Sequence, residues 1–472
     1  MIPPLIYPLA HLTLLSLTPH VFGAPAADSS IPLIGSAIPL TRRTPSLTPD
    51  VDQRGLVAKS QRDAVIARYF GGEPVRQRSN GSNSIINQLS DSDYYGTLAI
   101  GTPPVSFNVL LDTGSADLWV LGTTCGSMCD GFAMYDPSTS STFQNTSRPF
   151  DIQYGQGEAA GYVATETVQM AGFPVASQGI SVIDAVSTGF LTAPVSGLLG
   201  LAWETIATSQ RMPFWQTLAA SGAWDSPLFA VQLTRYTNTT NSQALEPGGV
   251  LNLGYTNSSL YTGSIEYSDI PGEPSFWYIP LASVNVQGKS IPLGNSAYAA
   301  IDTGTSNIAA PASAIQTIYS QIPGSKPATG TWAGYYQYPC STTVNVTFSF
   351  GQSTWTMSPA DFSFYQLPGS QCIGAFFEST SGGNINGVSW IIGDAFLKNV
   401  YTVFRYNPAA VGFAALSDVA TSQNGLNDAP LPSPTVGSSA AAVTSVNAAS
   451  ISRISRLAKV LMGIVLVFLS LV

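Results

Sequence analysis

Short runs that alternate apolar and polar residues dominate the body of the chain, residues 79–420. Four of these runs are rich in Val, Ile, Phe, Tyr and Thr and are bounded by Gly, Pro, Asn and Ser. They predict β-strands over 97–100, 106–111, 343–350 and 401–405. Only residues 212–221 and 311–321 have a pattern that favours a helix. We therefore expect a mainly β protein.

The N-terminal end of the chain carries an apolar stretch followed by small residues, within residues 1–23. This order predicts a secretory signal peptide that is removed after Gly23. A transmembrane anchor is the alternative, but the uninterrupted apolar run is shorter than the ~20 residues that cross a bilayer.

The C-terminal end is also apolar, over residues 460–472. A polar spacer, 450–459, and the small residues Asn447–Ala449 precede it. This order predicts attachment of a glycosylphosphatidylinositol (GPI) anchor at Asn447, and thus a membrane link through lipid. The prediction divides the end of the chain into a Ser/Pro/Ala-rich stalk, 419–447, and a removable signal, 448–472. A short tail anchor is the alternative.

Charge is low and unevenly distributed along the 472 residues, a length typical of two or three domains. Lys and Arg total 18 against 27 Asp and Glu, so the chain has no basic surface for nucleic acid. Residues 24–78 hold eight basic and five acidic side chains, whereas 79–420 hold seven basic and twenty-one acidic ones. We expect 24–78 to be a basic prosegment that covers an acidic domain, 79–418; a disordered basic linker is the alternative.

Both histidines, His11 and His20, lie in the predicted signal peptide. The mature protein would then contain no imidazole. That excludes Ser-His-Asp and Cys-His catalysis and a His-ligated zinc site. We expect chemistry from carboxylates, hydroxyls or backbone, with no metal and no cofactor.

Cysteines and glycosylation sequons also indicate the secretory pathway. Four cysteines fit two disulfides in an oxidising compartment. Three pairings are possible, and we favour the sequence-local one, Cys125 with Cys129 and Cys340 with Cys372. A metal site is the alternative, but the spacing is a poor zinc pattern. Asn-x-Ser/Thr acceptors occur at Asn80, Asn145, Asn238, Asn257 and Asn345.

One short motif occurs twice in the body. Asp112-Thr113-Gly114-Ser115 follows two leucines, and Asp302-Thr303-Gly304-Thr305 follows Ala300-Ile301. About ninety residues after each copy come two apolar residues and a glycine, at 198–200 and 391–393. A lone Asp-Thr-Gly is usually a turn, but this repetition predicts two similar lobes whose aspartates meet across a pseudo-twofold axis.

With these motifs, the sequence resembles the pepsin-like aspartic endopeptidases over residues 94–416. Further matching segments are 95–103, 117–120, 140–143, 154–157 and 390–396. The resemblance implies a bilobal, mainly β fold with a substrate cleft between an N-lobe, about 91–268, and a C-lobe, about 277–418. It also implies hydrolysis of peptide bonds without a covalent intermediate.

By this resemblance, Asp112 and Asp302 are the catalytic residues, with Asp302 closer to the base role and Asp112 to the acid role. Two adjacent carboxyls cannot both ionise, so they share one proton, as in pepsin. Glycine at 114 and 304 lets the backbone approach the carboxyls. Ser115 and Thr305 would donate hydrogen bonds to them, and Thr113 and Thr303 would hydrogen-bond across the lobes.

The resemblance also implies a mobile flap whose tip is Tyr154-Gly155-Gln156, with an ordinary hairpin tyrosine as the alternative. Trp119 would hold the Tyr154 hydroxyl, and Leu110 would line the primary pocket. Since Gln156 is uncharged, we expect large hydrophobic residues to flank the cleaved bond. The expected ligands are peptides, the chain's own prosegment as an inhibitor, and pepstatin-type inhibitors.

One residue departs from the family pattern, and one other class of protein could share this fold. Arg405 stands where many family members have aspartate, and near the dyad it would shift the pH optimum. A catalytically silent binding protein with the same cleft is the rival class, but both Asp motifs are intact.

We expect a monomer at the cell surface, with a soluble secreted enzyme as the alternative. The prosegment would be cleaved after Arg43 or Arg78.

Overall fold

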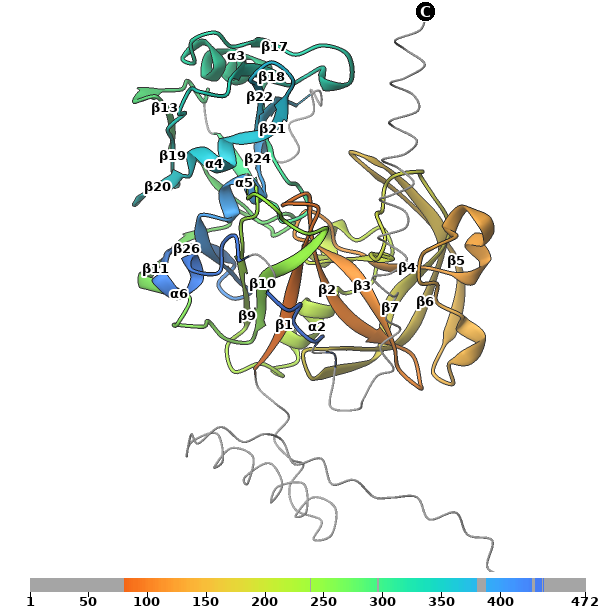
Figure 1. Ribbon diagram of the computed structural model, residues 1–472. Coiled ribbons are helices and arrows are strands. Elements are labelled where there is room, and N and C mark those ends of the chain that lie inside the picture. Colours follow the sequence, from red (N-terminus) through yellow and green to blue (C-terminus); the bar gives the residue numbers. More distant parts are fainter. Residues whose placement is uncertain are drawn as a thin grey trace, which may run out of the picture. The chain divides into compact units, whose positions relative to one another are not determined.

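The computed structural model describes residues 80–237, 239–294, 297–379, 388–426, 429–434 and 436. The predicted signal peptide, prosegment and GPI signal therefore lie outside the described residues. Within the described part, no helix is both long and apolar enough to cross a membrane. Strands dominate and helices are few and short, which confirms the mainly β prediction (Figure 1).

One large sheet has thirteen strands in the order β11-β26-β25-β9-β10-β1-β2-β3-β8-β4-β7-β6-β5. Figure 1 shows β9, β10, β1, β2 and β3 side by side in this order. The strands are β1 (Gly81–Gln88), β2 (Asp93–Ile100), β3 (Val105–Asp112), β4 (Leu118–Leu121), β5 (Gln144–Tyr154), β6 (Gly157–Met170), β7 (Phe173–Val186), β8 (Gly197–Gly200), β9 (Leu228–Leu233), β10 (Leu245–Leu253), β11 (Tyr261–Asp269), β25 (Val400–Arg405) and β26 (Ala410–Leu416).

Three smaller sheets form most of the second half, in the orders β12-β15-β24-β16-β23, β14-β13-β19-β20 and β17-β18-β22-β21. Their strands are β12 (Tyr278–Pro280), β13 (Ser283–Val286), β14 (Lys289–Ser290), β15 (Tyr298–Ile301), β16 (Ile308–Ala310), β17 (Lys326–Pro327), β18 (Tyr336–Pro339), β19 (Val346–Ser349), β20 (Thr354–Met357), β21 (Ser363–Leu367), β22 (Gln371–Gly374), β23 (Phe376–Glu378) and β24 (Val388–Ile392).

The helices are short. They are α2 (Phe214–Ala220), α3 (Ala312–Ser320), α4 (Pro359–Phe362), α5 (Asp394–Leu397) and α6 (Asp418–Thr421), with 3₁₀ helices at Thr123–Cys129, Pro137–Thr139, Glu204–Ile206 and Gly330–Trp332. Both predicted helices are present but shorter: α2 and α3 begin directly after their N-cap residues Pro213 and Pro311, and each ends one residue before the predicted limit.

Three of the four predicted strands fall inside observed ones, namely β2, β3 and β25. The fourth, predicted over 343–350, begins late, at Val346. The residues just before Val346 bond to Gln287 instead of forming a regular strand. Gln287 donates from its backbone to the Asn345 carbonyl and from its side chain to the Thr343 carbonyl. In β19, Val346 and Phe348 are buried while Thr347 and Ser349 are less so, as the period of a half-buried strand requires.

The two halves repeat one topology around the duplicated motif. β3 runs parallel to β8, with Leu111 opposite Leu199, and β15 runs parallel to β24, with Ile301 opposite Ile392. β8 is in turn antiparallel to β4, as β24 is to β16. The two apolar residues that recur after each motif therefore belong to β8 or β24, the strand that pairs with the one leading into the Asp motif. The same strand is needed in both halves, which explains why the pattern recurs.

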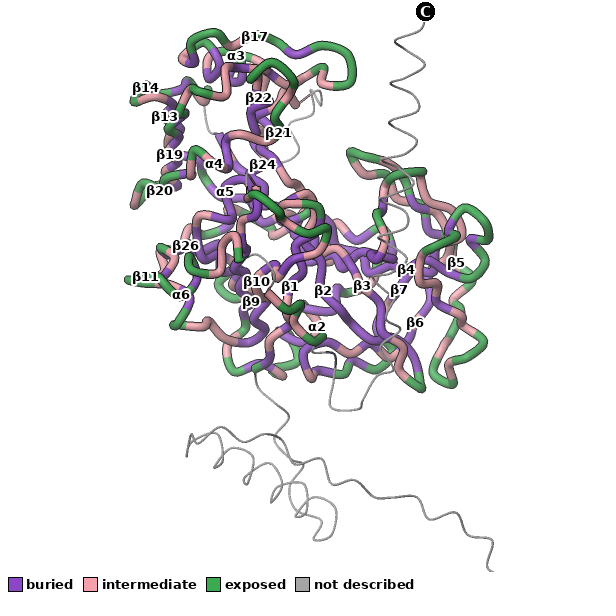
Figure 2. Tube along the Cα trace, in the orientation of Figure 1, coloured by how far each residue is buried: buried purple, intermediate pink, exposed green. Residues whose placement is uncertain are grey.

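Buried side chains form one main core that spans both halves, and they concentrate along the central strands (Figure 2). Three tryptophans, Trp203, Trp215 and Trp277, pack at its centre with ring centroids 4.9 to 5.3 Å apart. Both predicted disulfides are confirmed: Cys125–Cys129 closes a surface turn, and Cys340–Cys372 ties the end of β18 to β22.

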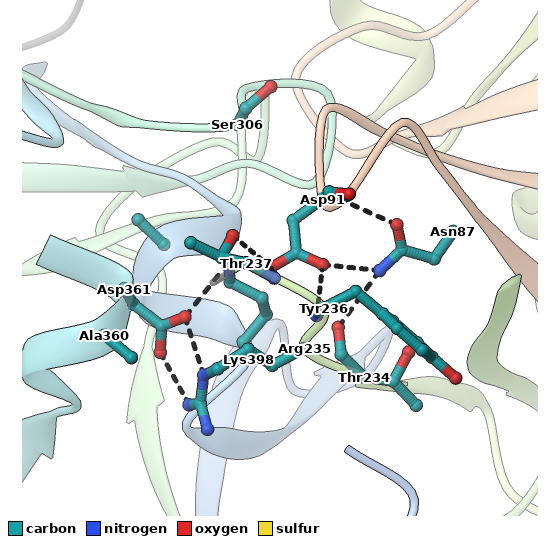
Figure 3. Close-up of polar contacts among 12 residues, drawn as sticks. Asn87, Asp91, Thr234, Arg235, Tyr236, Thr237, Ser306, Ala360, Asp361 and Lys398 are labelled. Carbon is teal, nitrogen blue, oxygen red and sulfur yellow. Dashed lines mark hydrogen bonds and ion pairs between the residues drawn. The ribbon is translucent and has the colours of Figure 1, made fainter. Parts of the chain in front are cut away.

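A buried ion-pair network joins the β1–β2 turn to the second half (Figure 3). Lys398 Nζ lies 2.7 Å from Asp91 Oδ2 and 3.0 Å from Asp361 Oδ1. Arg235 Nη2 lies 2.6 Å from Asp361 Oδ2. Burial alone would raise the pKa of Asp91, but the charge of Lys398 and hydrogen bonds from its neighbours lower it to about 2.

Candidate active site

The two Asp-Thr-Gly motifs occupy equivalent places. Asp112 is the last residue of β3, and Asp302 directly follows β15. Both aspartates are nearly buried, at 7% and 8% exposure. Each therefore projects from the end of a strand that is held in register by its parallel neighbour.

The local hydrogen bonds of the two carboxyl groups match. The Gly114 N–H donates to Asp112 Oδ1 at 2.7 Å, and the Ser115 hydroxyl donates to Oδ2 at 2.5 Å. In the second copy, the Gly304 N–H donates to Asp302 Oδ1 at 2.9 Å and the Thr305 hydroxyl donates to Oδ2 at 2.6 Å. Each motif thus supplies two donors that fix the orientation of its own carboxyl.

The glycines show that the two carboxyls face each other. A Cβ atom on Gly114 would lie 2.6 Å from Asp302 Oδ1, and one on Gly304 would meet the carboxyl of Asp112. Real Cβ atoms do not approach other atoms this closely. Only glycine therefore fits at each of these two positions, because a side chain there would collide with the aspartate of the other copy.

The two threonines link the copies. The Thr113 hydroxyl donates to the Ile301 carbonyl at 2.8 Å and accepts from the Thr303 N–H at 2.9 Å. The Thr303 hydroxyl donates to the Leu111 carbonyl at 2.7 Å and accepts from the Thr113 N–H at 3.1 Å. All four bonds lie in the buried base of the site, so they restrain how the two carboxyls lie relative to each other.

The electrostatics of the pair favour one retained proton. Burial, followed by the charge of Asp302, raises the pKa of Asp112 to about 7, although the donors Ser115 and Gly114 oppose that shift. A carboxyl that keeps its proton at mildly acidic pH can donate it, and its neighbour can accept one. The pair can therefore act as general acid and general base.

The proposed flap is the β5–β6 hairpin, with Tyr154 opposite Gly157 and the exposed residues Gly155 and Gln156 at the turn. The Trp119 indole N–H donates to the Tyr154 hydroxyl at 2.8 Å, as the resemblance implied. The charge of Asp112 is among the causes, after burial, that raise the pKa of Tyr154. Tyr154 is the last residue of β5, so its hydrogen bond ties the tip of the hairpin to Trp119 in β4.

Phe190 is a member of this region that the sequence did not indicate. Its ring stacks on Tyr154 with centroids 5.2 Å apart and on Trp119 at 6.0 Å. Half-buried Leu110 packs against the same cluster. Phe190 comes from the segment between β7 and β8, and no motif or periodicity in the sequence distinguishes it.

Asp394 is a second residue that the sequence analysis missed, although it directly follows the repeated Ile391-Ile392-Gly393. It is 2% exposed, and its Oδ1 has no hydrogen-bond partner. Burial, together with the charges of Asp302 and other acids, raises the pKa of this carboxyl well above its usual range despite the opposing charge of Lys398. Asp394 is therefore a buried carboxyl in which burial and the charge of Asp302 favour the protonated form.

The expectation that Arg405 lies near the dyad is wrong. Its guanidinium lies 4.1 Å from the centre of the Tyr267 ring and 3.4 Å from Asp269 Oδ1. Its Nε donates to the Pro408 carbonyl at 2.8 Å. These partners hold the charge at the β11–β25 side of the sheet.

Of the predicted glycosylation acceptors, Asn80, Asn145 and Asn345 are exposed and Asn257 is half-buried. Asn238 lies outside the described residues, as does the proposed GPI site at Asn447. Within the part of the chain that the structure describes, no group of three or more His, Cys, Asp or Glu side chains is placed to hold a metal ion.

The duplicated sheet topology and the paired aspartates define a hydrolase of the two-carboxylate class. The sequence model of the eukaryotic aspartyl protease family matches residues 93–416, and the chain belongs to this family. It is 44% identical to the major aspartyl peptidase 1 of Cryptococcus neoformans over 353 residues, 72% of each chain. It is 33% identical to rabbit (Oryctolagus cuniculus) pepsin II-1 and 32% identical to pig (Sus scrofa) pepsin A, over 80% of this chain and 95% of each pepsin. The protein is therefore an aspartic endopeptidase with the bilobal pepsin-like fold.

Proposed function

We propose that Asp302 is the base and Asp112 the acid in hydrolysis of internal peptide bonds. Asp302 takes a proton from water as the water oxygen bonds to the carbonyl carbon, while Asp112 gives its proton to the carbonyl oxygen. The tetrahedral intermediate then collapses: the carbon–nitrogen bond breaks as the amine nitrogen takes the proton held by Asp302, and one of the two hydroxyls on the carbon returns its proton to Asp112 as the new carboxyl group forms. The observation that supports this scheme is a buried carboxyl pair in which the pKa of Asp112 is about 7.

The substrate lies extended under the flap, with large hydrophobic residues on both sides of the cleaved bond. Leu110, Phe190 and the Tyr154 ring supply an apolar wall near the dyad. Gln156 at the flap tip has no charge to attract a basic side chain. Closure of the flap excludes water other than the attacking molecule and strengthens the electrostatic interactions of the dyad.

The enzyme is made as a zymogen. Residues 24–78 carry a surplus of three positive charges and the following body, 79–420, a surplus of fourteen negative ones, so the two attract. The prosegment inhibits in cis until it is cleaved, and the mature monomer is inhibited by pepstatin-type compounds.

The protein is exported, glycosylated at surface sequons and held at the cell surface through a GPI anchor at Asn447. The exposed acceptors Asn80, Asn145 and Asn345 and the two disulfides support export. Release from cells by phosphatidylinositol-specific phospholipase tests the anchor. Retention after that treatment would favour a tail anchor, and recovery in the medium without it would favour a soluble enzyme.

The catalytic proposal is tested by mass spectrometry of fragments from a peptide library across pH, with and without pepstatin. Cleavage between hydrophobic residues should fall as the pH rises through about 7, when Asp112 loses its proton. Asp302→Asn and Asp112→Asn should each lower kcat by at least about a hundredfold, with the thermal unfolding transition retained. Cleavage by either variant at the wild-type rate would disprove the assignment.

A further inference from the structure

A pocket of about 440 Å³ lies between β20, the end of β26 and α6, and we call it the β20 pocket. Neither aspartate of the dyad nor any residue of the flap lines it. Two cations, Arg235 and Lys398, are among its lining residues, and no acid of the described part of the chain is. The body of the chain, 79–420, has only seven basic side chains against twenty-one acidic ones. A pocket lined by two cations and no acid is therefore a distinct feature of this molecule.

The β20 pocket faces the positive side of the buried ion-pair network (Figure 3). Both cations of the network line the pocket, whereas its two carboxylates, Asp91 and Asp361, do not. The Asp361 carboxylate is fully buried and is shared between Arg235 and Lys398. An anion in the pocket would therefore meet the cations before it meets either carboxylate.

The guanidinium of Arg235 leaves one nitrogen for this pocket. Its Nε and Nη2 donate to the two oxygens of Asp361 at 2.8 and 2.6 Å, and Nη2 also donates to Asn399 Oδ1 at 2.9 Å. Nη1 has no hydrogen-bond partner among the described residues, and the side chain is 19% exposed. Because the guanidinium is planar and two of its nitrogens are held by Asp361, Nη1 is a charged donor in a fixed orientation.

Three further polar side chains of the pocket have hydrogen-bond donors that no described residue accepts. Asn424 Oδ1 accepts from the Arg235 backbone N–H at 2.8 Å, and its Nδ2 stays available. Thr354 and Thr356 are exposed, and neither hydroxyl bonds to another described residue. An ionised carboxylate accepts about four hydrogen bonds, and those from an arginine are the strong, charge-assisted ones. The donors of this pocket therefore match a carboxylate.

The rest of the pocket is apolar and follows the open edge of a strand. Half-buried Trp355 and the end of β26, Ala415 and Leu416, supply its apolar lining. β20 pairs only with β19, so it is an edge strand. Successive side chains of a strand point to opposite faces, yet residues 354, 355 and 356 all line the pocket. The pocket therefore runs along the free edge of β20, where an extended peptide can add as a strand.

We propose that the β20 pocket binds the C-terminal carboxylate of a peptide whose last residue is apolar. The carboxylate accepts from Arg235 Nη1, the last side chain packs against Trp355, and the peptide backbone pairs with β20. Cleavage between hydrophobic residues creates such C-termini, so the assignment of this ligand as a reaction product rests on the proposed function. The pocket is thus a second peptide site, separate from the cleft, and it holds the fragment that carries the new carboxylate.

The test is calorimetric titration of the full-length protein with N-acetyl-Leu-Phe and with its C-terminal amide. Pepstatin methyl ester, which has no free carboxylate, is present to occupy the cleft. The free acid should bind at least about tenfold more tightly than the amide, because a hydrogen bond to a charged group is stronger than a neutral one. Acetate, which lacks the apolar side chain, should bind at least about tenfold more weakly than the free acid.

Two variants assign this binding to the β20 pocket. Arg235→Gln should abolish the preference for acid over amide, and thermal unfolding checks that the variant is folded, since Arg235 also pairs with Asp361. Thr356→Glu leaves the network intact and adds a negative charge at the pocket wall, so it should weaken binding of the acid at least about tenfold. Thr343→Glu is the matched control, because Thr343 is also exposed but does not line the pocket. It should bind as the wild-type protein does.

Equal binding of acid and amide, or unchanged binding in Thr356→Glu, would overturn the proposal. Binding that disappears when pepstatin methyl ester is present would place the peptide in the cleft and would overturn it too. Acetate that binds as tightly as the peptide would make the pocket a general carboxylate site and refute the peptide assignment. Because the titration needs no turnover, failure of the proposed function, seen as no cleavage of the peptide library, is a separate result.

Discussion

The carboxyl of Asp112 makes the stability of the protein depend on pH in a predictable direction. Its pKa is about 7 in the folded protein against 3.8 ordinarily. Between these values the folded protein holds a proton that the unfolded chain has lost, so the free energy of unfolding falls as the pH rises from about 4 to 7. At about 1.4 kcal/mol per pKa unit, this loss is at most on the order of 4 kcal/mol.

Asp112→Asn should remove that dependence. The variant's free energy of unfolding, measured by urea titration at several pH values, should vary less between pH 4 and 7 than that of the wild-type protein. Asp130→Asn, at an exposed acid, is the control and should follow the wild-type curve. Parallel curves for the Asp112 variant and the wild-type protein would contradict the raised pKa.

Gly304 is a residue whose replacement should impair the dyad more than the fold. The added Cβ in Gly304→Ala would meet the Asp112 carboxyl, which must then move from its place beside Asp302. We expect kcat/KM to fall at least about a hundredfold, since displacements near 1 Å can have that effect. Circular dichroism and thermal unfolding check the fold, and wild-type kcat/KM in a folded variant would refute the close approach.

At the scale of the element, one side-chain hydrogen bond ties the tip of the β5–β6 hairpin to β4. Trp119 lies in β4 and is fully buried. Its indole N–H donates to the hydroxyl of Tyr154, the last residue of β5 before the hairpin's turn. Trp119→Phe and Tyr154→Phe should each lower kcat/KM about five- to tenfold, because a hydrogen bond contributes about 1 kcal/mol. The double variant should be no worse than either single one. Losses that multiply would show that the two residues act independently.

The sequence predicted the elements around the dyad well because their signals are local. Leu111 and Ile301 are apolar strand residues directly before the aspartates, and the two later Gly-ended apolar pairs are their strand partners. Phe190 escaped detection because its contacts join distant segments, which one sequence without homologues does not reveal. Arg405 was misplaced because its proximity to the dyad was inferred from its position in the family pattern, whereas its guanidinium lies over the Tyr267 ring.

At the scale of the whole molecule, the two disulfides should contribute unequally to stability. Cys340 and Cys372 are 32 residues apart in sequence, whereas Cys125 and Cys129 are four apart. In the chain-entropy treatment the longer loop contributes about 3.7 kcal/mol and the shorter about 1.9 kcal/mol. Replacing the Cys340–Cys372 pair by alanines should therefore lower the denaturation midpoint more than replacing the other pair does. The opposite order, in urea titrations of both double variants, would contradict this.

The buried network of Asp91, Asp361, Arg235 and Lys398 should decide how well the molecule withstands acid (Figure 3). The pKa of Asp91 is about 2, below its ordinary 3.8. The stability that this shift contributes, on the order of 2 kcal/mol, is complete above pH 4 and is lost only as the pH falls through about 2. The network therefore still stabilises the fold at mildly acidic pH, where the protonated Asp112 can act as the general acid.

Lys398→Met tests this role, because it leaves Asp91 buried without its cation. Loss of one partner of a buried pair costs about 3–5 kcal/mol. Without Lys398, burial raises the pKa of Asp91, so the variant's deficit relative to wild type should be largest near pH 7 and shrink as the pH falls toward 3. Leu89, Ser90 and Asp91, in the turn between β1 and β2, all have positive φ, which is a strained backbone conformation. Amide hydrogen exchange in this turn should therefore be faster in the Lys398→Met variant than in the wild-type protein. Exposed Lys326→Met is the control, and a deficit that does not change with pH would refute the mechanism.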